Sequence, residues 1–201
     1  GISVVKKFNE INVAIDYAFS SSSNEEIIVE DFFKGDEYTV ESMTFDGKTE
    51  ILAVTKKLKV DGTNNTVANV LESVNFESED YKMLSALAIK SLKALNYNHG
   101  PGHTEILYNK SNAEKVLVET AGRGGGFKVF ESLVPAISKV NVTKILIMQA
   151  IGLKFRTPLK IFNNYGIIKF FTGRKGRIRL IQGFDKIKSK DNLPVSYTHL
   201  T

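Results

Sequence analysis

The sequence predicts an α+β fold in which helices pack on an antiparallel sheet. Alternating polar and apolar residues flank Asp46 and Gly47, a pair typical of a β-hairpin turn. Residues 78–98 then place apolar side chains on one helical face, with Ser78 as the expected N-cap. Two further strands within residues 104–121 surround the turn KSNAE. With a helix before the first hairpin, this order of elements is typical of α+β folds.

The remaining elements follow from local patterns. Residues 8–20 have partly helical spacing and end at the polar run SSSNEE. IIVEDFF, residues 27–33, predicts a short buried strand before the turn signal KGDE, and the polar residues 61–73 predict a surface loop. Residues 129–152 are expected to be helical on both sides of Pro135 and Asn141. The apolar face of the helix within 78–98 is expected to contain Met83, Leu84, Leu87, Ala88, Leu92 and Leu95.

Charge and composition predict three parts. Residues 1–150 form the main domain and carry 16 basic against 20 acidic residues, whereas residues 151–190 carry 11 against 1. Residues 151–193 are predicted to be a small basic β subdomain, with strands GIIKFFT and GRIRLIQGF around the turn GRKG. The tail PVSYTHLT, residues 194–201, fits no element and is predicted to be non-native.

Composition also excludes several function classes. The chain has 201 residues, 42% hydrophobic and 24% charged, and no cysteine, which excludes disulfides, thiolate metal sites and a cysteine nucleophile. Its apolar runs are too short to span a membrane and no signal peptide opens it, so we expect a cytoplasmic protein without a membrane partner. The opening GISVVKK lacks an initiator Met, and we expect a piece of a longer protein.

The segment HTEILYNKSNAEKVLVETAGRGGG predicts a metal site. Glu105 and Glu119 stand on strands joined by a short turn, and cross-strand neighbours on one face lie roughly 5 Å apart. Carboxylate oxygens so placed suit Mg²⁺, although two solvated strand residues are the alternative. His103 shares the face of Glu105 and either contacts a substrate or phosphate or braces Glu105.

A glycine-rich loop follows the second glutamate. Glycine lets the backbone approach a ligand, and Arg123 offers donors matched to phosphate or carboxylate. AGRGGG is no Walker loop, because it lacks the Gly-Lys-Ser/Thr ending.

Five motifs in order resemble the ATP-grasp superfamily, in particular its carboxylate-amine ligases. They are IIVEDFFKGDEYTV, AVTKK, the amphipathic helix running into HGPGHTEI, LVETAGRGGG and ESLVPAISKVN, and the resemblance covers residues 1 to about 185. It implies an ATP-grasp fold with the nucleotide between two α+β subdomains. The likeness also implies that Gly1 ends a phosphate-covering loop and that an N-terminal domain precedes it.

The resemblance implies a nucleotide site. A hinge strand would contact adenine through Glu30 and Asp31, with Phe33 adding backbone contact and apolar cover. Glu37 would bind the ribose hydroxyls, and Lys56 would reach a phosphate.

The resemblance also implies the catalytic centre. Glu105 and Glu119 would hold Mg²⁺, or Mn²⁺ in its place, across the β and γ phosphates of ATP. Arg123 would steady the acyl phosphate or the substrate carboxylate. Many members carry an asparagine where this chain has Ala121, so a second metal is either held more weakly or bound by another group.

The implied reaction joins a small-molecule carboxylate to an amine through an acyl phosphate. The alternative within the fold is an enzyme of the biotin carboxylase or carbamoyl phosphate synthetase type, which uses bicarbonate. An alternative of another class is a nucleic-acid-binding module on the basic segment GRKGRIR, which the apolar residues Ile178, Leu180 and Ile181 disfavour. A homodimer is compatible with each of these functions.

Overall fold

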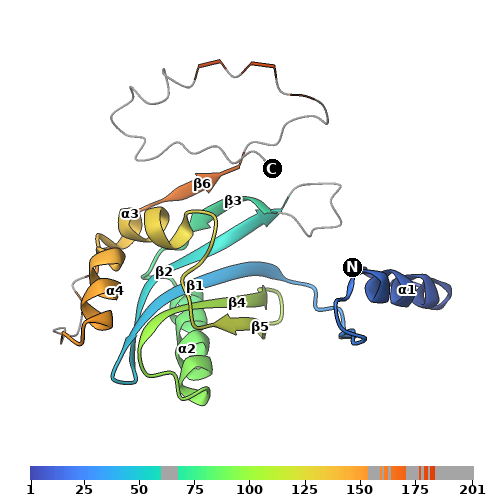
Figure 1. Ribbon diagram of the computed structural model, residues 1–201, viewed down its shortest axis with the longest axis horizontal. Helices are drawn as coiled ribbons and strands as arrows, with labels where there is room; N and C mark the ends of the chain where they lie inside the picture. The colour runs from blue at the N-terminus through green and yellow to red at the C-terminus, as the bar shows by residue number, and fades with distance from the viewer. Residues whose placement is uncertain are drawn as a thin grey trace.

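The computed structural model describes residues 1–59, 68–153, 159, 161–162, 164–170, 177, 179–180 and 182–183. Its centre is a six-stranded antiparallel sheet with the order β5-β4-β1-β2-β3-β6 (Figure 1). The strands are β1 (Asp36–Phe45), β2 (Lys48–Lys59), β3 (Ala68–Ser73), β4 (Gly100–Asn109), β5 (Glu114–Ala121) and β6 (Ile167–Lys169).

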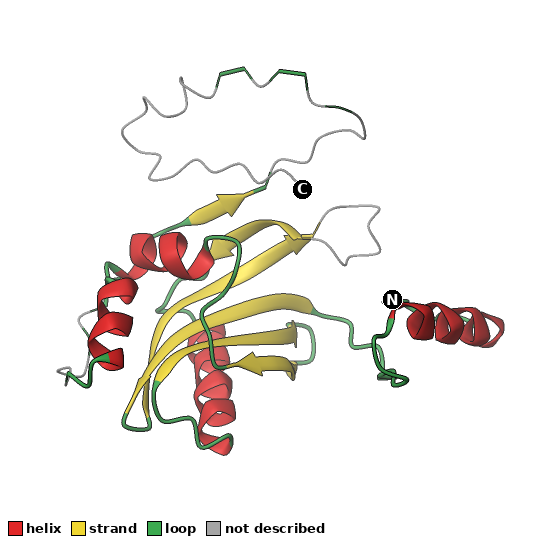
Figure 2. Ribbon diagram, in the orientation of Figure 1, coloured by secondary structure: helices red, strands yellow, loops and turns green. Residues whose placement is uncertain are grey.

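Helices cover both faces of this sheet, which confirms the predicted α+β class (Figure 2). The helices are α1 (Ile11–Ser21) after a 3₁₀ turn at Phe8–Glu10, α2 (Glu79–Ala94), the π-helical turn η2 (Val129–Leu133), α3 (Val134–Ser138) and α4 (Val142–Ala150). One face packs on α2, and the other packs on η2, α3 and α4. Helix α1 lies beside the sheet, and none of its residues is buried. Within the described part of the chain, no helix has the length and hydrophobicity of a membrane span.

The first hairpin and the central helix form where the sequence predicts them. Asp46 and Gly47 have φ angles of 48° and 75°, the left-handed pair that a tight hairpin turn requires. Ser78 caps α2, because its Oγ accepts a hydrogen bond of 3.2 Å from the Tyr81 backbone N–H. The expectation for Leu95 was wrong: α2 ends at Ala94, and the Leu95 side chain turns to solvent.

The predicted buried strand at residues 27–33 was wrong. No strand forms there, and Ile28 and Val29 are 85% and 82% exposed. Strand β1 begins only at Asp36, and its two neighbours in the sheet are β2 and β4. The apolar run therefore has neither a strand partner nor a layer over it among the described residues.

The predicted loop at residues 61–73 was wrong in its second half. Residues 68–73 form β3, because Leu71 packs into the core and pairs with Lys57 of β2. Residues 61–67 lie outside the described residues.

Strand β6 comes from the first of the two strands predicted in the C-terminal segment. It pairs with β3, at the edge of the main sheet. In the second predicted strand, residues 176–184, the described residues 177, 179–180 and 182–183 form no strand, and the other four lie outside the described residues, as does the whole tail at 194–201. The division between residues 1–150 and 151–193 therefore stays a prediction.

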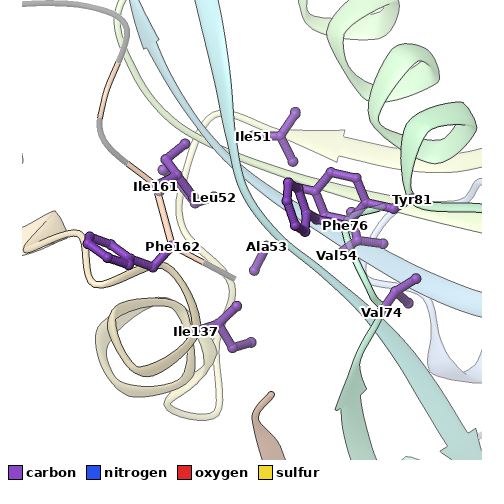
Figure 3. A pocket seen from close by; sticks show the side chains of 10 residues that line it. All are labelled: Ile51, Leu52, Ala53, Val54, Val74, Phe76, Tyr81, Ile137, Ile161 and Phe162. Carbon is purple, nitrogen blue, oxygen red and sulfur yellow. The ribbon is translucent and has the colours of Figure 1, made fainter. Parts of the chain in front are cut away.

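An apolar cavity of about 160 Å³ lies beside residues 51–54 of β2, where the pairing with β3 ends (Figure 3). Phe76, Tyr81, Ile137 and Phe162 are among its lining residues, and none of the lining residues is charged. Its lining residues include members of both core clusters and no carboxylate, histidine or lysine.

The N-cap of α2 provides a test of the fold. Replacing Ser78 with Ala removes the hydroxyl that accepts the Tyr81 N–H and should lower the free energy of unfolding by about 1 kcal/mol. Urea denaturation measures this change. Ser78→Asp keeps an acceptor oxygen and should restore most of the loss; an unchanged midpoint for Ser78→Ala would show that the cap contributes nothing.

Candidate active site

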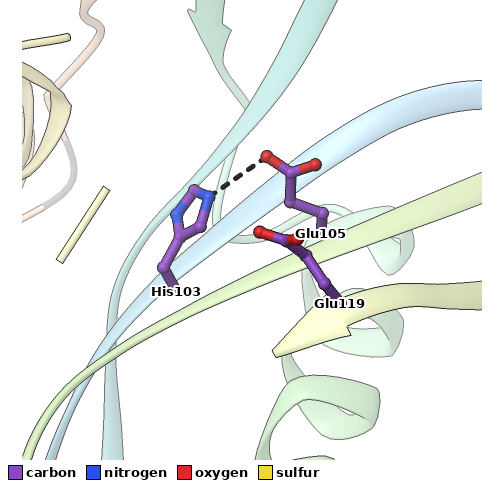
Figure 4. Close-up of side chains that lie close together, drawn as sticks. All are labelled: His103, Glu105 and Glu119. Carbon is purple, nitrogen blue, oxygen red and sulfur yellow. Dashed lines mark hydrogen bonds and ion pairs between the residues drawn. The ribbon is translucent and has the colours of Figure 1, made fainter. Parts of the chain in front are cut away.

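The β4–β5 hairpin brings the two predicted metal ligands together. Glu105 and Glu119 are direct cross-strand partners on one face, and His103 lies beside them (Figure 4). One ligand atom of each of these three residues lies within 4.8 Å of the others. The side chain of Glu105 is 20% exposed and that of Glu119 is 52% exposed, so the pair opens to solvent on the β5 side.

His103 contacts Glu105 directly, as the bracing role considered for it requires. Its Nε2 lies 3.2 Å from Glu105 Oε1, and its Nδ1 contacts Glu41. Burial alone would lower the pKa of His103, but hydrogen bonds to Glu105 and Glu41, with their negative charges, raise it to about 9. The hydrogen bond from His103, together with Lys57 and against burial, lowers the pKa of Glu105 to about 2. The pair is therefore an imidazolium and a carboxylate at neutral pH.

Glu41 is a residue of the site that the sequence analysis missed. Its side chain is fully buried, and its Oε2 accepts a 3.0 Å hydrogen bond from the Gly125 backbone N–H. One sequence signal could have found it, because Glu37, Thr39 and Glu41 alternate along β1 and so share the face of the predicted metal ligands.

The lysine at the site is Lys57, and Lys56 does not join it. Lys57 Nζ lies 2.5 Å from Glu37 Oε1 and 2.6 Å from Glu105 Oε1. Burial opposes its charge, but Glu105 and Glu37 prevail and raise the pKa of Lys57. Lys56 points to the opposite face and pairs with Asp36 at 2.6 Å, since neighbouring residues of a strand face opposite sides.

Arg123 stands at the open side of the carboxylates. Its Nη2 lies 3.9 Å from Glu119 Oε1, and its Nη1 donates a 3.0 Å hydrogen bond to the Gly124 carbonyl. The side chain is 59% exposed, so its other donors face solvent. The loop of residues 122–125 thus carries an available guanidinium next to one predicted ligand.

The predicted nucleotide residues are placed in two groups. Glu37 lies in the site, where Lys57 and Lys59 bind its two carboxylate oxygens. Glu30 and Asp31 are exposed on the segment before β1, and no hydrogen bond or ion pair between described residues links them to the carboxylates. Phe33 is half-buried against Gly35.

The donor set fits a hard divalent cation. Mg²⁺ typically takes one or two protein carboxylates and completes its shell with phosphate oxygens and water. Glu105 and Glu119 offer carboxylates of that kind, whereas both nitrogens of His103 are already directed at carboxylates. Glu105 Oε1 is shared by Lys57 and His103, so a cation there competes with two positive charges.

Comparisons with known proteins give one family and one fold. The sequence profile of the ATP-grasp domain matches residues 3–131. No curated protein sequence matches the chain.

Three solved structures illustrate the fold. An L-amino acid ligase from Bacillus licheniformis matches with a TM-score of 0.53 and 21% identity over 60% of this chain and 30% of its own. A biotin carboxylase from Campylobacter jejuni in complex with β,γ-ATP matches with a TM-score of 0.67 and 18% identity, over 82% of this chain and 37% of its own. A phosphoribosylglycinamide synthetase from Anaerococcus prevotii matches with a TM-score of 0.60 and 18% identity, over 81% of this chain and 41% of its own. The chain thus spans less than half of each of these proteins.

The imidazolium of His103 predicts a loss of stability at alkaline pH. Its folded pKa of about 9 lies above the ordinary value of 6.5, so the folded state binds more protons between these values. The stability from this group is complete below pH 6.5 and should be lost as pH rises toward 9. Urea denaturation at fixed ionic strength measures the decline. In His103→Gln this part of the pH dependence should vanish, and an identical decline in that variant would refute the assignment.

Glu105 predicts the opposite dependence at acid pH. Its folded pKa of about 2 lies below the ordinary value of 4.5, so its contribution is complete above pH 4.5 and should be lost as pH falls toward 2. The same measurement should give a flatter acid limb for Glu105→Gln than for the unaltered chain. Equal slopes in the two proteins would mean that Glu105 is not held as a carboxylate by its neighbours.

Proposed function

The chain belongs to the ATP-grasp domain family, and from this premise we propose that it forms the ATP-binding part of a cytoplasmic carboxylate-amine ligase. The observation that carries the proposal is the cross-strand pair Glu105 and Glu119, flanked by Lys57 and Arg123 on one side of the sheet. Two carboxylates for a cation and two cationic groups for phosphate oxygens form one continuous centre. The L-amino acid ligase among the structural relatives supports the same reaction class.

The proposed reaction has two steps. An oxygen of the substrate carboxylate attacks the γ-phosphorus of ATP, and the bond from that phosphorus to the β–γ bridging oxygen breaks to release ADP. The amine nitrogen then attacks the acyl carbon of the acyl phosphate, the carbon–oxygen bond to phosphate breaks, and the amine proton passes to solvent. The products are an amide, ADP and phosphate, and no covalent bond to the protein forms.

The residues of the chain contribute position and charge rather than a nucleophile. Glu105 and Glu119 are proposed to hold Mg²⁺, for which Mn²⁺ can substitute; bound there, the cation neutralises charge on the β and γ phosphates. Arg123 is proposed to steady the acyl phosphate or the substrate carboxylate, because its free donors face solvent beside Glu119. Lys57 replaces Lys56 as the proposed phosphate contact, since its ammonium already lies at Glu105.

Nucleotide binding is proposed to use the chain segment before the sheet as well. Glu30, Asp31 and Phe33 are assigned to the adenine, and Glu37 to the ribose hydroxyls. Because Lys57 and Lys59 occupy both oxygens of Glu37, ribose binding requires that at least one of these lysines moves. A move of Lys57 from Glu37 toward a phosphate would satisfy both assignments.

Bicarbonate is the second candidate acceptor. The biotin carboxylase from Campylobacter jejuni covers 82% of this chain, more than the amino acid ligase does. The two candidates differ in which small molecule stimulates ATP turnover. An ATP-dependent phosphate-release screen of the complete gene product over amino acids, other carboxylates with amines, and bicarbonate separates them; stimulation by bicarbonate alone would favour the second.

Glu119 gives a direct test of the metal assignment. In the complete gene product, Glu119→Gln should lower Mg²⁺-ATP turnover by about 10- to 100-fold, because the neutral amide is a weaker ligand for a hard cation. Phosphate release measures turnover. Glu114→Gln is the matched control on the same strand, at the opposite end of β5 beside Asn112, and should retain activity. Full activity of Glu119→Gln would remove Glu119 from the metal site.

Lys56 and Lys57 lie on opposite faces of β2, so substituting each of them tests which face takes part in the proposed ATP chemistry. Lys57→Met should lower turnover by about tenfold or more, because it removes an ammonium from the carboxylate centre. Lys56→Met changes the other face, at the Asp36 pair, and should have little effect. The same phosphate-release assay compares the two. A larger loss for Lys56→Met would contradict the placement of Lys57 in the site.

A further inference from the structure

One buried carboxylate joins two separate parts of the candidate site. Glu41 is fully buried, and its two oxygens have different partners: Oε1 contacts His103 Nδ1 of β4, and Oε2 accepts the Gly125 N–H of the loop after β5. We propose that Glu41 is a positioning residue that couples the glycine loop to the metal-binding strand. The consequence for ATP chemistry rests on the proposed function, whereas the coupling of loop and strand does not.

The Glu41 carboxylate can be buried only because His103 and the Gly125 N–H bind its two oxygens. A carboxylate removed from water is stable only when charged or hydrogen-bonded groups compensate the lost hydration. The compensation here comes from the ring nitrogen Nδ1 of His103 and from the backbone amide of Gly125, so the carboxylate links β1, β4 and the loop at one point. A side chain needed only to fill this volume would pack there as well without charge.

Each partner of Glu41 leads to a different side of the proposed reaction centre. Through its Nε2, His103 reaches Glu105, one of the two proposed metal ligands. Gly125 lies two residues after Arg123, whose guanidinium binds the Gly124 carbonyl. A shift of the Glu41 carboxylate therefore moves the proposed ligand and the loop of the arginine together.

The loop approaches Glu41 so closely that only glycine fits. A Cβ added at Gly125 would lie 2.3 Å from Glu41 Oε1 and 3.0 Å from His103 Nδ1. At the next residue, Gly126, an added Cβ meets nothing within 4 Å. These neighbouring glycines provide a matched pair of substitutions, one that disturbs the Glu41 contact and one that leaves it intact.

The test compares Glu41→Gln, Gly125→Ala and the control Gly126→Ala in the complete gene product. Native-state hydrogen exchange of the Gly125 amide reports whether the loop is held. Paramagnetic broadening of the Glu105 and Glu119 amides by Mn²⁺–ATP, followed by NMR, gives the dissociation constant at the site. Glutamine keeps one acceptor oxygen and loses the other, so one of the two donors loses its partner.

We expect the substitutions of Glu41 and of Gly125 to change both the Gly125 exchange rate and the Mn²⁺–ATP dissociation constant. Glu41→Gln and Gly125→Ala should each accelerate Gly125 exchange and raise the Mn²⁺–ATP dissociation constant by about tenfold, a size usual for residues that orient metal ligands. Gly126→Ala should change neither. Because Glu41 and Gly125 share one contact, the double variant should be no worse than the more severe single one.

Two results would overturn the coupling. One is a Gly125→Ala variant with a released loop and an unchanged Mn²⁺–ATP affinity; the other is a Glu41→Gln variant in which only the unfolding free energy falls, which is the effect of a residue with a purely structural role. Absence of broadening in the unaltered chain would instead contradict the proposed metal site. The exchange of Gly125 would then still decide whether Glu41 holds the loop.

Discussion

The site depends on a run of alternating charges on one face of the sheet. Glu41, His103, Glu105, Lys57 and Glu37 follow one another in direct contact across β4, β1 and β2. Burying an unpaired ion costs on the order of several kcal/mol, so no member could stay at this depth without its neighbours. Removing one member leaves its neighbour as a buried ion without a partner, which carries the same free-energy cost. The network therefore links three strands through their side chains and holds Glu105 in position.

The alternation of side chains along each strand separates structural from chemical roles. Along β1, Tyr38 and Val40 pack against α2, while Glu37, Thr39 and Glu41 face the other side. Further along β1 that second face becomes apolar, where it packs under η2 and α3. One sheet face thus contains both a hydrophobic core and a polar centre, in successive stretches of the same strands. The apolar stretch holds the layers together, and the polar stretch carries the candidate site.

The sequence predicts what depends on local pattern and leaves undetermined what depends on contacts between distant residues. Asp46 and Gly47 predict their turn because few residue pairs adopt its backbone angles, and Glu105 and Glu119 are predictable because a short hairpin determines their register. Lys56 and Lys57 cannot be distinguished in this way, because the face that each occupies depends on the pairing of β2 with β1. Glu41 is harder still, since its partners lie 62 and 84 residues away.

The charges of the site balance before any ligand binds, and this balance determines how a cation can enter. Ion pairs join four acidic side chains of the site to four basic ones: Glu37, Glu41, Glu105 and Glu119 to Lys57, Lys59, His103 and Arg123. A divalent cation arriving alone would compete with Lys57 and His103 for Glu105 and add charge to a neutral cluster. A cation that arrives with a triphosphate brings an excess of negative charge, which Lys57 and Arg123 can turn toward. For the proposed function, the electrostatics of the cluster therefore favour joint binding of metal and nucleotide over binding of the metal first.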